Sequence, residues 1–69
     1  MDVDRLIGRN LSRLLADLDI EPERLASALK ISPYALHRVL TGQQRLRPPM
    51  LLKAITFLSV PVAAVFAEA

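Results

Sequence analysis

Apolar residues recur every three or four positions along most of this chain, and short links rich in polar residues or proline interrupt the recurrence. That spacing places the apolar side chains on one face of an α-helix. The pattern predicts an all-α fold of five helices, at about 3–18, 22–29, 33–41, 49–58 and from Pro61 onward. Because the last of these has too few residues to be stable alone, we expect it to pack against the rest of the domain.

The segment 33–41 has clear start and stop signals and two unlike faces. Ser32 is a good N-cap, Pro33 suits the first helical position, and Gly42 can take the left-handed conformation that ends a helix. The face that we expect to be buried carries Leu36, Val39 and Leu40. The opposite face offers a phenol, an imidazole and a guanidinium, from Tyr34, His37 and Arg38. Such a surface favours a binding role, and our main hypothesis is that it contacts DNA.

The helices at 22–29 and 33–41 are joined by a connection of only a few residues. Two short helices joined so closely are typical of a helix-turn-helix, in which the first crosses the DNA backbone and the second enters the groove. The loop that follows is polar and basic, and a pair of prolines at 48 and 49 ends it. Its candidates for contact with the DNA backbone are Gln43, Gln44, Arg45 and Arg47.

Charge is distributed unevenly along the chain, although the formal net charge is only +2. Residues 24–67 contain six Lys or Arg residues and no Asp or Glu, whereas residues 1–23 contain six acids and three arginines. A chain polarised in this way presents a basic side to a polyanion; an ordinary solvated surface is the alternative explanation. The arginines of the first helix are explained more simply as solvated charge, and they are Arg5, Arg9 and Arg13.

The apolar content is high for a single domain of 69 residues, at 52% with a mean hydropathy of +0.32. A small domain has a large surface for its volume, so we expect part of this apolar surface to be buried against a second copy. The predicted homodimer surface consists of Phe57, Val62, Val65 and Phe66. The uncharged run 54–67 is too short for a membrane span and is interrupted by Pro61. We therefore expect one domain over residues 1–69 that does not enter a membrane.

Residue types that carry catalysis or bind metals are scarce. The chain has no cysteine and one histidine, no glycine-rich phosphate loop, and no pair of acids on an apolar face. These features argue against an enzyme, a metal site and a bound cofactor. The absence of cysteine also fits a cytoplasmic location.

Five segments that cover most of the chain follow one another at a characteristic spacing. They are IGRNLSRLL at 7–15, LAxxLxIS at 25–32, SPYALHRVLTG at 32–42, a proline at 48 or 49, and FLSVPVAAVF at 57–66. Together they resemble the helix-turn-helix family of the phage Cro and C1 repressors, also called the XRE family. The resemblance implies a compact five-helix lambda-repressor-like domain whose second and third helices form the helix-turn-helix.

The resemblance also implies a function. It points to a cytoplasmic, nucleoid-associated transcription regulator that binds a roughly palindromic operator in double-stranded DNA as a homodimer. Regulation is expected through abundance or a protein partner, because no second domain is left to sense a ligand.

Under this resemblance the exposed face of helix 33–41 lies in the major groove of a duplex. Arg38 contacts guanine or holds a phosphate, His37 meets a base edge or is merely solvated, and Tyr34 touches a thymine methyl group or bonds a phosphate. The full set of DNA-binding residues implied is Ser32, Pro33, Tyr34, His37, Arg38, Thr41, Gln43, Gln44, Arg45 and Arg47.

The sequence departs from the family pattern at three kinds of position, one of which is an arginine–acid pair of the family replaced by Leu15 and Leu40. Asp19, Lys30 and Ser59 stand at helix ends where family members usually have glycine, and a left-handed conformation there is unfavourable for other residues. Glu21 and Pro22 stand where the family has Ser or Thr followed by Gln, whose side chain meets the DNA backbone. A carboxylate there repels phosphate. The alternative function is therefore a protein-interaction module of the same fold, antitoxin-like or sequestering another regulator, that has lost DNA binding.

Overall fold

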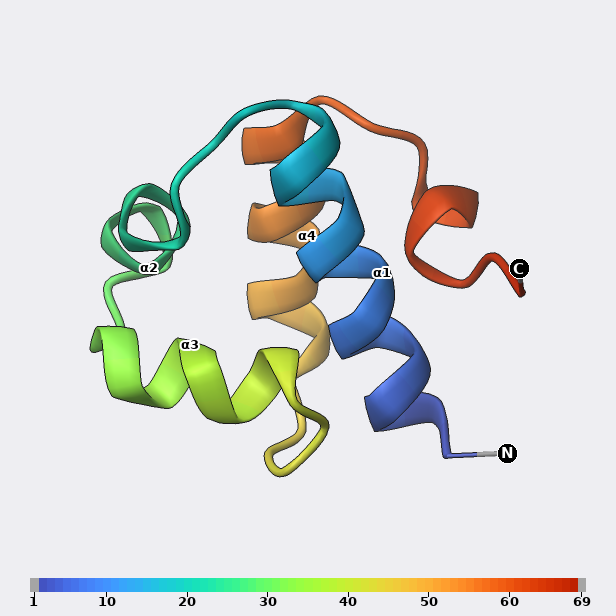
Figure 1. The fold of residues 1–69 in the computed structure, drawn as a ribbon, viewed down its shortest axis with the longest axis horizontal. Helices are drawn as coiled ribbons and strands as arrows, with labels where there is room; N and C mark the ends of the chain where they lie inside the picture. Colours follow the sequence, from blue (N-terminus) through green and yellow to red (C-terminus); the bar gives the residue numbers. More distant parts are fainter. Residues whose placement is uncertain (1, 69) are drawn as a thin grey trace.

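The computed structural model describes residues 2–68, which form four α-helices and one turn of 3₁₀-helix (Figure 1). The elements in chain order are α1 (Val3–Asp17), α2 (Pro22–Leu29), α3 (Pro33–Leu40), α4 (Pro48–Leu58) and η1 (Val62–Val65). The first four predicted helices are confirmed, and each observed end lies within one residue of the predicted end. No helix among the described residues is long and apolar enough to cross a membrane.

The prediction of a fifth α-helix after Pro61 is wrong, because η1 is a single 3₁₀ turn. The amide of Ala64 donates to the carbonyl of Pro61 at 2.9 Å, and the amide of Phe66 donates to that of Ala63 at 3.2 Å. Bonds to the third residue back define a 3₁₀-helix, which is used in such short pieces. Four residues are too few to offset the unfavourable nucleation of an α-helix.

Three of the α-helices end on a left-handed residue that is not glycine. Asp19, Lys30 and Ser59 have φ angles of 56°, 57° and 56°, as their alignment with the glycines of the family pattern implied. In each case the amide of the next residue donates to the carbonyl five residues back, which is the Schellman arrangement. The residue that follows is apolar and packs against the core in all three, namely Ile20, Ile31 and Val60. These apolar contacts hold the helix ends where the family uses glycine.

The helices surround one core. In Figure 1, α3 lies across the lower part of the view, α2 is seen nearly end-on above it, and η1 lies on the opposite side of α1 from α2. α1 packs against α3 and η1, while α2 packs against α3 and α4. The buried core cluster draws on every element and consists of Ile7, Leu11, Leu15, Leu25, Ala26, Leu29, Leu36, Val39, Ala54, Ile55, Leu58 and Val65.

Gly8 sets the distance between α1 and α3. A Cβ atom at this position would lie 2.5 Å from the carbonyl oxygen of Val39 and 2.7 Å from that of Leu40. These are backbone atoms, so they cannot move without moving α3. The missing side chain therefore lets the end of α3 rest directly on α1 and fixes how α3 is presented.

Asn10 attaches the C-terminal segment to α1. Its side chain is completely buried, and its amide nitrogen donates to the carbonyl oxygens of Val65 at 2.8 Å and Ala67 at 2.9 Å. These bonds and the full burial of Val65 hold η1 against the domain. The prediction that Val65 belongs to an exposed dimer surface is therefore wrong, because its side chain is part of the core.

Candidate nucleic-acid interface

The two faces of α3 differ as the sequence predicted. Leu36 and Val39 are buried, and Leu40 is half-buried against the core. On the other side the tyrosine ring of Tyr34 is 69% exposed, and His37 is exposed as well. The apolar side chains therefore anchor α3, and its polar side chains are left at the surface of the domain.

Arg38 is partly sheltered on this outer face. Its guanidinium carbon lies 5.9 Å from the centroid of the Tyr34 ring, a cation–π distance. Its Nε atom is buried and has no hydrogen-bond partner within residues 2–68. Contact with a ligand would therefore fall to the two terminal nitrogens, which still offer donors side by side.

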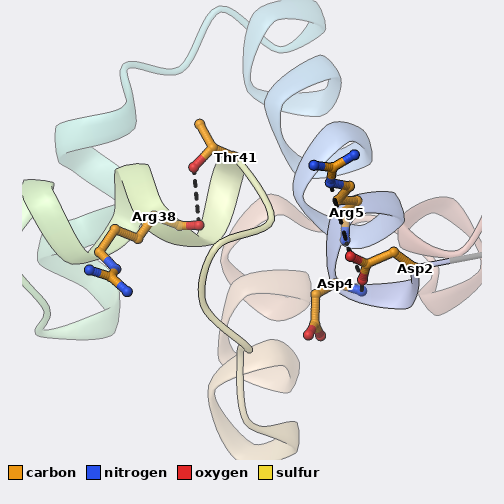
Figure 2. Close-up of polar contacts among 5 residues, drawn as sticks. All are labelled: Asp2, Asp4, Arg5, Arg38 and Thr41. Atoms are coloured by element: carbon orange, nitrogen blue, oxygen red, sulfur yellow. Dashed lines mark hydrogen bonds and ion pairs between the residues drawn. The ribbon is translucent and has the colours of Figure 1, made fainter.

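The hydroxyls at the two ends of α3 are engaged differently. The Ser32 oxygen caps the helix by accepting a bond from the amide of Ala35 at 3.0 Å, which leaves its own hydrogen free to donate. The Thr41 hydroxyl donates to the carbonyl of His37 at 2.9 Å and to that of Arg38 at 3.3 Å, and Figure 2 shows the second of these bonds. Ser32 can thus donate to a phosphate as it stands, whereas Thr41 must first rotate. Pro33 is exposed between Ser32 and Tyr34.

The loop after α3 presents the remaining predicted residues. Gln43, Gln44, Arg45 and Arg47 are all exposed, and the amides of both glutamines donate to the carbonyl of Arg38, at 2.8 and 3.2 Å. Arg45 is not free of a partner, because its Nε lies 3.6 Å from a carboxylate oxygen of Asp4 on α1. With the arginine side chain 80% exposed, this ion pair is weak.

Two hollows border α3 where it meets the other helices. One, of about 450 Å³, lies between α1 and the end of α3 and is lined by Asp2, Arg5, Leu6, Arg9, Leu40 and Thr41. The other, of about 290 Å³, lies toward the start of α2 and is lined by Pro22, Glu23, Pro33, Leu36, His37 and Leu40. Sequence reasoning assigned Arg5 and Arg9 to solvated charge. The sequence shows that these two arginines are spaced i, i+4 on one helix face. Only the packing of α1 on α3 shows that this face borders the hollow.

The predicted dimer surface is exposed in three of its four residues. Phe57, Val62 and Phe66 are 37%, 51% and 42% exposed, and Val65 is excluded by its burial. Leu52 on α4 is a further large apolar side chain at the surface, at 59%. Within residues 2–68 no group of three or more His, Cys, Asp or Glu side chains comes together to hold a metal ion.

Taken together, α2, the turn at residues 30–32 and α3 form a helix-turn-helix whose second helix carries the exposed polar face. Two crystal structures of ClgR, the clp gene regulator of Corynebacterium glutamicum, are similar to this chain at 25% identity, with TM-scores of 0.88 and 0.86. Each similarity covers 93% of this chain, and they cover 68% and 83% of the two ClgR chains.

A third similar structure is the restriction-modification controller protein C.AhdI of Aeromonas hydrophila. It is 22% identical with a TM-score of 0.82, over 91% of this chain and 96% of that one. No protein-family model and no curated protein matches this sequence. The structural likeness identifies the fold as that of the Cro/C1-type, or XRE-like, helix-turn-helix regulators.

Proposed function

We propose that this chain is a sequence-specific transcription regulator that binds double-stranded DNA and places α3 in the major groove. The observation that carries the proposal is the outer face of α3, where Tyr34, His37 and Arg38 stand on a helix whose other face is locked into the core. The similar structures are of a gene regulator and a controller protein, and both names describe regulators rather than enzymes.

The chemistry of this face suits the groove of a duplex. The terminal nitrogens of Arg38 can donate together to O6 and N7 of guanine, and His37 can bond to a base edge. Around them, Ser32, Gln43 and Arg47 are exposed donors suited to phosphate oxygens. The base contacts would give specificity, while the phosphate contacts would fix the register and provide the salt-dependent part of the affinity.

The proposal includes a homodimer on a roughly palindromic operator. One domain offers a single short recognition helix, so two domains are needed to read a longer site. The exposed apolar side chains of Phe57, Val62 and Phe66 support a second copy as the partner, since pairing would remove them from water. Such a protein would act in the cytoplasm, in association with the nucleoid.

Binding is tested by selecting duplexes from a random library with the native chain and measuring affinity by fluorescence anisotropy. We expect Arg38→Ala to weaken binding to the selected duplex by about 1–3 kcal/mol, roughly 5- to 150-fold, and to relax the choice at one base pair. Arg13→Ala is the matched control, because Arg13 is an exposed arginine of α1 that lines neither hollow. Enrichment of no sequence and binding of no duplex would refute the proposed function.

One observation favours a second function, a protein-interaction module of the same fold. Glu21 is the N-cap of α2 but makes no capping bond with its side chain, and Pro22 removes an amide from the first turn. The start of α2 is therefore poorly suited to phosphate. Co-purification of a different protein at defined stoichiometry, together with the absence of DNA binding, would support this alternative.

A further inference from the structure

The larger hollow beside α3 brings cationic side chains of α1 to the margin of the proposed DNA surface. Arg5 and Arg9 lie one turn apart on α1 and line the hollow together with Leu40 and Thr41 from the end of α3. Both arginines are exposed, and Leu6 and Leu40 supply apolar walls. Two guanidinium groups beside an apolar wall form a suitable site for a phosphate group.

The first carbons of the Arg5 side chain pack on the segment that follows α3. A Cβ atom on Gly42 would lie 2.5 Å from Cγ of Arg5, so the aliphatic part of Arg5 packs directly on that glycine. Gly42 has a φ of 78°, which brings the backbone into this close approach. Figure 2 shows the Arg5 side chain on α1 beside the loop that follows α3. The guanidinium beyond this packed part is largely exposed, and its Nε lies 4.0 Å from a carboxylate oxygen of Asp2.

The smaller hollow, which lies between α3 and the start of α2, differs in charge and is lined on the α3 side by Pro33, Leu36, His37 and Leu40. On the α2 side it is lined by Glu23 and Pro22, and Glu21 precedes them as N-cap. Two carboxylates near the first turn repel phosphate, and proline has no amide hydrogen to donate. If α3 enters a groove, the backbone contact at its margin is therefore more favourable on the α1 side than on the α2 side.

We propose that the hollow lined by Arg5 and Arg9 is a phosphate site that binds the DNA backbone beside the groove entered by α3. This assignment rests on the proposed function and names a contact surface that it does not include. Asp2 also lines the hollow, with a carboxylate oxygen 4.0 Å from Nε of Arg5. The other carboxylate oxygen of Asp2 accepts bonds from the amides of Asp4 and Arg5, so Asp2 caps α1 while it lowers the positive charge of the hollow.

The first test compares Arg5→Gln/Arg9→Gln with the control Arg13→Gln/Lys53→Gln, which removes two positive charges from exposed positions outside the hollow. Affinity for a labelled duplex of mixed sequence is measured over a series of potassium chloride concentrations. Each lost phosphate contact lowers the slope of log K against log salt by about 0.9, so we expect a decrease of about two for the hollow variant. The control should change the slope by less than half as much. Glutamine keeps Cβ and Cγ of Arg5, so the contact with Gly42 is preserved.

A second variant moves the affinity in the other direction. Asp2→Asn removes the acid from the hollow, and asparagine is as good an N-cap as aspartate. We expect a several-fold tighter Kd at low salt, and a smaller change for Asp17→Asn, which removes an acid at the far end of α1. Equal effects of the two variants would show that only overall net charge matters, and would overturn the site.

The outcomes separate the two proposals. Failure of the native chain to bind any duplex refutes the proposed function and this site with it. Native affinity with an unchanged salt slope in both Arg5→Gln/Arg9→Gln and the single Arg5→Gln and Arg9→Gln variants refutes the site alone. A decrease in slope that is uniform across sequences, with selectivity for the selected duplex retained, is the result expected for contacts to phosphate rather than to bases.

Discussion

At the residue scale, left-handed residues at the helix ends are places where the native chain is not optimal. Lys30 has a φ of 57°, and an L-residue with a Cβ atom is unfavourable there by roughly 1 kcal/mol. Glycine removes that strain but has a more flexible unfolded state, which offsets part of the gain. We expect Lys30→Gly to raise the free energy of unfolding by about 0.5 kcal/mol, measured by urea denaturation, and to raise Tm by about 3 °C.

The control for this substitution is Lys53→Gly. Lys53 is an exposed lysine inside α4, where glycine is unfavourable by about 1 kcal/mol relative to good helix formers. The two substitutions should therefore shift stability in opposite directions although they make the same chemical change. Destabilisation by both would mean that the left-handed conformation at Lys30 carries little strain.

Individual side chains show how far the sequence alone can be interpreted. The inward residues of α3 were predicted because burial follows the helical period, and Leu36 and Val39 are buried as expected. The buried role of Asn10 was not predicted, since its partners are the carbonyls of Val65 and Ala67, more than fifty residues away. Val65 was assigned to the surface because its burial also depends on packing between segments far apart in the sequence, here η1 and α1. A contact that depends on tertiary packing leaves no local periodicity to detect.

At the scale of elements, the crossing of α1 and α3 controls how the proposed DNA surface is held. Gly8→Ala in an open helix would be stabilising by about 1 kcal/mol. Here the added methyl group would meet the carbonyl oxygens of Val39 and Leu40, so the helices must separate. We expect a loss of about 1–3 kcal/mol in the free energy of unfolding, with weaker DNA binding as α3 shifts.

Thermal unfolding of Gly8→Ala is compared with that of Ser12→Ala. Ser12 is an exposed residue of α1, and its replacement should change stability by no more than about 0.5 kcal/mol. A Gly8→Ala protein as stable as the native chain would show that α1 and α3 can separate without loss. If Gly8→Ala lowered the stability but left the DNA affinity unchanged, the close contact of α1 with α3 would matter for stability and not for DNA binding.

The positions of the helices were predicted better than the contacts between them. Caps and prolines mark the starts of α2, α3 and α4 in the sequence itself, so the four α-helices were found. The last element failed because a run of apolar residues does not distinguish one 3₁₀ turn from a short α-helix. The sequence showed the regular spacing of the arginines of α1. It could not show that Arg5 and Arg9 line a hollow, because that depends on where α3 packs.

At the scale of the whole molecule, the proposed dimer and the proposed DNA binding depend on each other. If Val62 and Phe66 pack against a second copy, the double variant Val62→Glu/Phe66→Glu should sediment as a monomer, because it places carboxylates in an apolar contact. Leu18→Glu is the control, since Leu18 is 44% exposed at the end of α1 and lies outside the proposed surface. If the double variant does not fold, the single variant Val62→Glu provides the test, because Val62 is the more exposed of the two positions.

The same variants distinguish a DNA-reading dimer from one that forms for another reason. A dimer that engages both half-sites gains from the high effective concentration of its second domain, whereas a monomer does not. We therefore expect Val62→Glu/Phe66→Glu to weaken anisotropy-detected binding to a palindromic duplex by tenfold or more, yet to leave binding to a duplex with one half-site nearly unchanged. If the native chain bound both duplexes equally, each domain would act alone, and the exposed apolar side chains would need a different partner.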